Sequence, residues 1–334
     1  MPVQPITRRD AIKISGLTAG ATLLASMFPR RVRAAAQATG SAGTPTGLRL
    51  AHLTDIHVQP ELRGGEGLTA CLKHVGSLPA ARKPDLIITG GDLVMDTFDQ
   101  QFARSKQLWD LFTGTFKDQS PVPVEHCLGN HDIWGWNKSK SGTTGQEPQW
   151  GKKWALEALA LPAPYRAIER GGWKIIILDS VHTDPKNANG YIGRLDDQQF
   201  AWLSDELKRT PAATPILVVS HIPILSVCSW VWDGAAKEKD NRWEVSAGNL
   251  HIDGVKLHKL FTAHPNVNLC LSGHIHKTDH LSMDGVAYIC DGAVCGAWWK
   301  GRKDRCDEGY GIVDLLPDGT FKHEYVTYGW KAEA

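Results

Sequence analysis

Several short apolar segments of the chain are followed at once by acid, amide or imidazole side chains. Asp55 and His57 follow the segment 48–54, and a similar His-x-His pair follows 267–272. The full set of such residues is Asp55, His57, Asp92, Asn130, His131, Asp132, His221, His274 and His276. Carboxylate, neutral imidazole and amide groups suit Mn, Fe or Zn. These motifs contain no cysteine, which argues against a thiolate site. The residue types therefore indicate metal chemistry.

The spacing of these residues indicates how they would be held. Asp-x-His and His-x-His sequences place two ligands on one rigid element where a strand ends, and open α/β sheets build their sites at strand carboxyl ends. Gly91, Gly129 and Gly273 adjoin the candidates and permit sharp turns and close backbone approach. A single Asp-x-His or Gly-Asp pair is common as a turn or a helix cap. The whole series, in this order, favours a functional site over chance.

Strands and helices in a defined order must bring these residues together. Helical patterns occur at 68–78 and 196–209, and in the second Phe200, Leu203 and Leu207 recur at helical spacing. The early alternation of strands and helices predicts an α/β fold with α+β character, and a late run of strands predicts a second, more antiparallel sheet. The strand-like segments are 48–54, 85–90, 122–129, 174–180, 215–220, 267–272, 286–292, 310–316 and 321–328.

The composition is that of a soluble globular protein. The chain has 334 residues, of which 42% are hydrophobic and 22% charged, and its formal net charge is +1. This length allows one large α/β domain or two small ones. A surface that binds nucleic acid would normally be basic, and none is evident. No apolar stretch reaches the ~20 residues that a transmembrane helix needs.

Residues 1–36 differ from the rest of the chain. Six basic residues stand against one acid, with paired arginines at positions 8 and 9, a modestly apolar stretch, and a small-residue site at positions 34–36. This pattern resembles a twin-arginine signal peptide; a disordered basic tail is the alternative. We therefore expect the twin-arginine export machinery as a partner and a periplasmic or extracellular location. Residues 37–46 would be a linker and 47–334 one catalytic domain.

The remaining cysteines, tryptophans, histidines and basic residues are less specific. The seven cysteines include no CxxC pair, and the sequence permits but does not establish a disulfide among Cys290, Cys295 and Cys306. Eight of the thirteen tryptophans fall in loops near the motifs and either pack these loops or form an aromatic rim beside the metals: Trp134, Trp136, Trp150, Trp230, Trp232, Trp243, Trp298 and Trp299. A basic run at 300–305 is a solvated loop or supplies a phosphate clamp. The other histidines are expected to be structural or at the surface, with His182 the strongest exception: His52, His126, His182, His251 and His280.

The motifs as a series resemble those of the calcineurin-like metallophosphoesterases, from about residue 47 to 295. The segment 190–207 also resembles a helix of that family, in which a glutamine precedes Trp-Leu. The resemblance implies a four-layer α-β-β-α sandwich with two mixed β-sheets and a dinuclear site at the strand ends. It implies two divalent cations (Mn, Fe or Zn), one held by Asp55, His57, Asp92 and His276, the other by Asp92, Asn130, His221 and His274.

The same resemblance implies a reaction. A water shared by two cations has a lowered pKa, and the resulting hydroxide would attack phosphorus in line with the leaving oxygen. His131 would protonate the leaving group, and Asp132 would hold that imidazole charged and oriented; a structural His131 is the alternative. Met95 stands where the purple branch of the family has a ligating tyrosine, so an Fe(III)–tyrosinate centre is not expected.

From these residues we expect an exported enzyme that hydrolyses a small-molecule phosphoester, with a phosphodiester preferred. A phosphomonoesterase with the same centre is the alternative, because monoesterases share the pattern. A non-catalytic scaffold of the same fold is a third interpretation, although such proteins usually lose ligands and this chain keeps the whole set. The metal identities, the natural substrate, the oligomeric state and signal cleavage are left open by the sequence.

Overall fold

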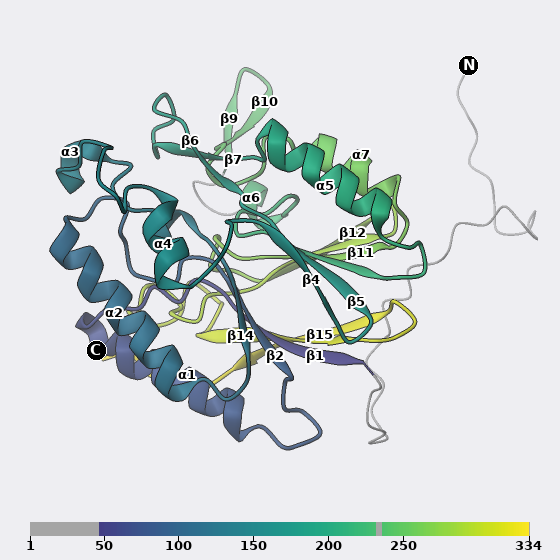
Figure 1. Ribbon diagram of the computed structural model, residues 1–334, viewed down its shortest axis with the longest axis horizontal. Helices are drawn as coiled ribbons and strands as arrows, with labels where there is room; N and C mark the ends of the chain where they lie inside the picture. Colours follow the sequence, from purple (N-terminus) through teal and green to yellow (C-terminus); the bar gives the residue numbers. More distant parts are fainter. Residues whose placement is uncertain (1–46, 232–235, 334) are drawn as a thin grey trace, which may run out of the picture. The chain divides into compact units, whose positions relative to one another are not determined.

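The computed structural model describes residues 47–231 and 236–333, and two mixed β-sheets form its centre. Helices cover the outer face of each sheet (Figure 1). The expected signal peptide and linker, residues 1–46, lie outside the described residues. In the part that the structure describes, no helix is long and apolar enough to cross a membrane.

The first sheet has five strands, and its central strand is β1. Strands β1, β2 and β3 are parallel, whereas β14 pairs antiparallel with β1, and β15 with β14. Along β1, Leu50 faces the second sheet and Leu53 faces the helices, because successive side chains point to opposite faces. In sheet order the strands are β15 (Phe321–Thr327), β14 (Gly309–Leu315), β1 (Leu48–Leu53), β2 (Leu86–Gly90) and β3 (Val124–Cys127).

The second sheet has six strands. Its four inner strands are parallel, and each edge strand pairs antiparallel with its neighbour. In sheet order they are β12 (Asp279–Met283), β13 (Val286–Cys290), β11 (Val267–Ser272), β8 (Ile216–Val219), β5 (Trp173–Ile177) and β4 (Arg166–Arg170).

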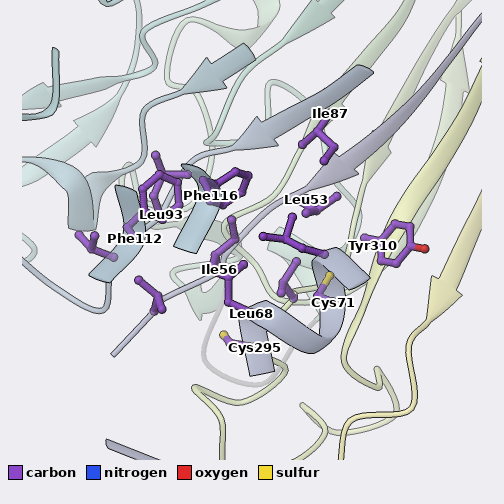
Figure 2. Close-up of a cluster of buried hydrophobic side chains, with 14 of the residues drawn as sticks. Leu53, Ile56, Leu68, Cys71, Ile87, Leu93, Phe112, Phe116, Cys295 and Tyr310 are labelled. Carbon is purple, nitrogen blue, oxygen red and sulfur yellow. The ribbon is translucent and has the colours of Figure 1, made fainter. Parts of the chain in front are cut away.

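Three hydrophobic clusters separate four layers. One lies between the two sheets, one between the first sheet and α1 with α2, and one between the second sheet and α5 with α7. Figure 2 shows part of the cluster beneath α1, where Leu68 and Cys71 lie near strand residues such as Leu53. The helices are α1 (Gly64–Ser77), α2 (Phe102–Gln119), α5 (Asp197–Arg209) and α7 (Gly254–Thr262). The α-β-β-α sandwich expected from the sequence is confirmed.

Shorter elements occupy the connections. Two antiparallel ribbons are β6 (Val181–Thr183) with β7 (Tyr191–Gly193), and β9 (Ala236–Lys239) with β10 (Arg242–Val245). The short helices are α3 (Lys138–Ser141), α4 (Lys152–Ala158) and α6 (Cys228–Val231), with 3-10 turns at Glu61–Arg63 and Asn130–Asp132. All seven cysteines fall within the described residues and none forms a disulfide.

The expected late antiparallel sheet is wrong in its pairing. Strands β14 and β15 join the first sheet beside β1, and β11 and β13 are parallel members of the second. The long return of the chain from one sheet to the other leaves no local trace in the sequence. The helix expected at 196–209 is confirmed, with Asp196 capping it by accepting a hydrogen bond from the Gln199 amide at 2.7 Å.

Candidate metal centre

Loops that follow five strands meet at one edge of the two sheets. Within the first sheet, the Asp55 amide donates to the Gly91 carbonyl at 3.0 Å, which joins the loops after β1 and β2. Between the sheets, the His274 amide donates to the Asp55 carboxylate at 2.8 Å. These bonds place candidates from both sheets beside one another.

One group of side chains gathers around His57 and His276. Their Nε2 atoms lie 3.1 Å apart. The Asp55 Oδ1 atom is 3.4 Å from the His276 Nε2, and the Asp92 Oδ2 atom is 3.5 Å from the His57 Nε2. The structure thus brings together the four residues expected at the first metal position.

A second group gathers around His221. Its Nε2 atom lies 3.2 Å from three acceptor or ring atoms, namely Asp92 Oδ2, Asn130 Oδ1 and His274 Nδ1. The same Asp92 oxygen therefore stands between both groups, while its other oxygen, Oδ1, accepts a hydrogen bond from the His131 amide at 2.8 Å. This arrangement suits a carboxylate shared by two cations.

The hydrogen bonds behind the imidazoles show that these groups fit a cation. The Nδ1 atoms of His57, His276 and His221 each face a backbone carbonyl, those of Met95, Gly296 and Gly90, at 3.3, 2.7 and 2.8 Å. Since a carbonyl only accepts, each Nδ1 carries a proton, and each ring in its neutral form turns a bare Nε2 toward the centre. Lone pairs and carboxylate oxygens that face one another at about 3 Å need a positive charge between them.

The backbone at the centre is strained in a consistent way. Asp55, His57, Asp92, His274 and His276 all have φ between +44° and +71°, a region that residues with a side chain rarely adopt. Such outliers persist only where surrounding structure enforces them, and they concentrate at functional sites.

Two motif glycines make this geometry possible. A Cβ atom at Gly129 would collide with the backbone nitrogen and carboxylate of Asp92. One at Gly273 would collide with the Thr54 hydroxyl and the Asp55 carboxylate. The close approach expected of these glycines is therefore an approach to the candidate ligands themselves.

The two carboxylates remain ionised despite their burial. Burial by itself would raise the pKa of Asp92, but the imidazoles of His221 and His131 hold it well below its usual value. Burial also acts to raise the pKa of Asp55, and His276 and His221 lower it below the usual range. Each carboxylate therefore offers a negative charge to the centre.

The imidazoles fall into two classes. Burial lowers the pKa of His57 to about 3 and that of His274 to about 4, so both rings are neutral at pH 7. Burial lowers the pKa of His221 as well, but Asp92 outweighs it and raises that pKa to about 9. Metal binding requires the neutral ring, so a cation bound in this group would replace the proton of His221.

His131 lies at the open side of the centre. Its ring centroid is 4.8 Å from that of His57, and its side chain is 31% exposed, whereas the side chains of His57 and His221 are almost fully covered. Its Nδ1 atom makes an ion-pair contact of 3.3 Å with Asp96 Oδ1. Burial lowers the pKa of His131, but Asp92 and Asp96 raise it above its usual value.

The expected contact between Asp132 and the His131 imidazole is replaced by a different arrangement. The Asp132 carboxylate accepts hydrogen bonds from the amides of Gly129 and Leu93, both at 2.8 Å, and of Val94 at 3.3 Å. These bonds hold the turn that carries Asn130 and His131. The carboxylate that lies beside the His131 ring is that of Asp96, in the loop after β2.

Three residues near the centre escaped the sequence analysis or were not singled out. Asp96 lies outside every motif, so nothing in its neighbourhood marks it. The Cys295 sulfur lies within 4.8 Å of ring nitrogens of His57 and His276, although no motif contains a cysteine. Trp298 was one of several loop tryptophans, and its ring centroid is 4.6 Å from that of His276.

The histidines expected to be structural have other partners. His52 is buried against Asp291 at 2.7 Å, and His251 pairs with Asp253 at 2.9 Å. His182 lies on β6, and its Nε2 atom has no hydrogen-bond partner among the described residues. His182 is in none of the groups of side chains that could hold a metal in the described part of the chain.

Comparison with known proteins identifies relatives along most of the chain. A family model described as calcineurin-like phosphoesterase matches residues 48–278. The chain is 26% identical over 295 residues to a probable cyclic nucleotide phosphodiesterase of Synechococcus sp., covering 85% of this chain and 93% of that protein. It is 24% identical over 293 residues to the 3',5'-cyclic adenosine monophosphate phosphodiesterase CpdA of Escherichia coli, covering 83% and 88%.

A solved structure supports the architecture. A dimetal phosphatase from Danio rerio superimposes with a TM-score of 0.57 at 11% identity, covering 85% of this chain and all of that one. At so low an identity the likeness concerns the fold alone. The family match, which spans both groups of candidate ligands, carries the activity: the protein is a hydrolase of phosphoric ester bonds that uses divalent metal, and the chain belongs to the calcineurin-like phosphoesterase family.

Proposed function

We propose that this protein hydrolyses a phosphodiester at a centre of two divalent cations. The observation that carries the proposal is the single Asp92 oxygen placed 3.5 Å from the Nε2 of His57 and 3.2 Å from that of His221. Around it, two sets of carboxylate, amide and imidazole donors converge. Oxygen and nitrogen donors of this kind suit Mn, Fe or Zn. Two such cations, when bound, activate a water and neutralise charge on the phosphoryl oxygens.

The chain's own residues complete the reaction. His131 faces the open side, and the carboxylates of Asp92 and Asp96 raise its pKa, which favours the protonated ring whose Nε2–H can be donated to the leaving oxygen. Asp96 orients the ring through Nδ1. Asp132 fixes the turn and thereby the position of Asn130. Each residue of the Gly-Asn-His-Asp motif thus has a separate task.

The preference for a diester rests on the relatives. The cyanobacterial and Escherichia coli proteins that the chain resembles over more than four-fifths of its length are named as cyclic nucleotide phosphodiesterases. We infer a phosphodiester substrate similar in size to a cyclic nucleotide, with a phosphomonoester as the alternative.

We also propose export through the twin-arginine route, which carries folded proteins and would suit a protein that takes up its metals beforehand. Its support is the pattern of residues 1–36.

The decisive experiment compares two diesters with different leaving groups. The purified full-length chain loaded with Mn²⁺ would be assayed with bis-p-nitrophenyl phosphate and with 3',5'-cyclic AMP. Nitrophenolate leaves as a stable anion, whereas the alkoxide of the cyclic nucleotide needs a proton. His131→Gln should keep its bound metal and lose about 10²-fold or more in kcat on cyclic AMP, with a smaller loss on the nitrophenyl ester.

Controls separate the alternatives. His280→Gln, an exposed histidine on β12, should keep wild-type rates on both substrates. Equal losses of His131→Gln on the two diesters would remove its role as proton donor. Faster wild-type turnover of p-nitrophenyl phosphate than of its diester would favour a phosphatase. A wild type that binds no metal and cleaves nothing would favour the scaffold interpretation.

A further inference from the structure

Trp298, which belongs to none of the ligand motifs, lines one side of the candidate metal centre. Its ring centroid lies 4.6 Å from that of His276 and 6.1 Å from that of His57. Both histidines are buried, whereas Trp298 is half-exposed. An indole in this position borders the first group of ligands and also meets solvent, where a substrate would arrive.

The backbone around Trp298 is held in a costly conformation. Trp298 and Trp299 have φ of +53° and +69°, two bulky residues in succession in the left-handed region. Trp299 anchors the pair: it is 1% exposed, and its Nε1–H donates to the His57 carbonyl at 2.8 Å. Its ring packs so closely on α1 that a Cβ at Gly67 would collide with it. Strain enforced in this way at a site indicates a function for the residue that it presents.

Other aromatic rings near the centre are less suited to contact a substrate. Tyr191 has its ring 6.3 Å from that of His274 but is only 8% exposed. Trp136 packs edge-on against Phe98, beneath the Lys152 ammonium. Trp298 thus combines exposure with direct contact to the ligand histidines.

We propose that Trp298 is a specificity-determining residue that stacks on a flat aromatic group of the substrate, such as a nucleobase. The inference rests on the proposed phosphodiesterase function and names the substrate class of that site: diesters that carry an aromatic ring. The Lys303 ammonium lies 5.5 Å from the indole centroid, within the range of a cation–π contact that helps to hold the ring in place. Stacking of a base on an aromatic side chain contributes about 1–3 kcal/mol.

The test compares an aromatic with an aliphatic diester in the full-length, metal-loaded enzyme. Trp298→Ala should lower kcat/KM for 3',5'-cyclic AMP by about tenfold or more, mainly through KM, since stacking of this strength corresponds to roughly 5- to 150-fold. With glycerophosphoethanolamine, which has no ring, the change should stay below about twofold. Trp298→Phe should keep most of the activity on cyclic AMP. Trp243→Ala, an exposed tryptophan on β10, is the matched control and should change neither substrate.

Binding without turnover separates this inference from the proposed function. Titration calorimetry of metal-loaded wild type should show tighter binding of AMP than of ribose 5-phosphate, and Trp298→Ala should remove that difference. This holds even if the wild type cleaves no diester, a result that would contradict the proposed function alone. Equal losses on aromatic and aliphatic ligands, or loss of bound metal in Trp298→Ala, would overturn the stacking role and leave Trp298 as a cover for His276.

Discussion

At the scale of single residues, two carboxylates divide work that the motif alone assigns to one. The Asp132 carboxylate accepts hydrogen bonds from three backbone amides, whereas the Asp96 carboxylate makes an ion-pair contact with the His131 imidazole. Burial, followed by Asp92, raises the pKa of Asp132 to about 7, which its backbone bonds oppose. Substitution of Asp132 should therefore mainly change the free energy of unfolding, and substitution of Asp96 should mainly change kcat.

Asp132→Asn is expected to destabilise the fold. An asparagine in the same position would turn its NH₂ group toward one of the backbone N–H donors, which leaves a buried donor unsatisfied at a cost of about 1–3 kcal/mol. Urea denaturation of the metal-free protein would measure the difference.

Asp96→Asn is the companion variant and should lose kcat with a smaller loss of urea stability, because the Asp96 carboxylate also accepts hydrogen bonds from the Phe98 and Asp99 amides but is 17% exposed to water. Its amide stays beside His131 Nδ1 but no longer faces the imidazole with a negative charge. An Asp132→Asn variant as stable as the wild type would contradict the structural role of Asp132, and a fully active Asp96→Asn variant would contradict the role of Asp96 beside His131.

At the scale of elements, the glycine after β3 is expected to be irreplaceable. Gly129→Ala places a methyl group against Asp92, so bound metal and activity should both fall sharply. Gly114→Ala is the control, because a Cβ there meets no atom within 4 Å and the residue lies inside α2. That variant should gain up to about 1 kcal/mol from helix propensity and keep its activity. Metal analysis would measure bound metal and thermal melting would measure stability in the two variants. A Gly129→Ala variant with a full complement of metal would contradict the close approach of Gly129 to Asp92.

The elements with local signals were predictable, and those defined by long-range pairing were not. The helix at 196–209 has its own cap and apolar face, and the strand ends with their polar residues mark the ligand candidates. By contrast, β14 returns to pair with β1 across most of the chain length, which no local pattern encodes. Asp96 and Trp298 reach the centre only through loop conformations, with a left-handed backbone at Trp298. Residue type and spacing therefore did not mark Asp96, and they did not distinguish Trp298 from the other loop tryptophans.

At the scale of the whole molecule, a network of one buried aspartate and two histidines joins the two sheets. Asp291, which follows β13 of the second sheet, meets His52 of β1 at 2.7 Å and His323 of β15 at 2.8 Å. Burial lowers the pKa of His323, but Asp291 outweighs it and raises that pKa above 6.5. Burial acts to raise the pKa of Asp291, yet His323 and His52 hold it below its usual value.

The stability from this network should depend on pH with a definite sign. A raised histidine pKa contributes stability that is complete below about pH 6.5 and is lost as pH rises through the folded-state pKa, and a lowered aspartate pKa contributes above about pH 4. His323→Gln should therefore lower the melting temperature by about 2 °C or more at pH 5–6 and by much less at pH 9. Glu324 also raises the pKa of His323, and His280 lies nearby.

A second histidine serves as a control of opposite sign. Burial, and then Lys152, lower the pKa of His182, so its protonation in acid opposes folding. His182→Gln should therefore gain melting temperature relative to the wild type as pH falls toward 5. If His323→Gln lost as much stability at pH 9 as at pH 6, its pairing with Asp291 would not be ionic.

The order in which the donors occur along the chain has a consequence for biosynthesis. Asp55, His57, Asp92 and Asn130 emerge early, and the imidazoles of His221, His274 and His276 follow much later. At about 5–20 residues per second, the growing polypeptide would carry only the early candidate ligands for roughly 7 to 30 seconds before His276 is synthesised. Tight cation uptake at the proposed centre would therefore have to wait until the strands of the second sheet have been synthesised and folded.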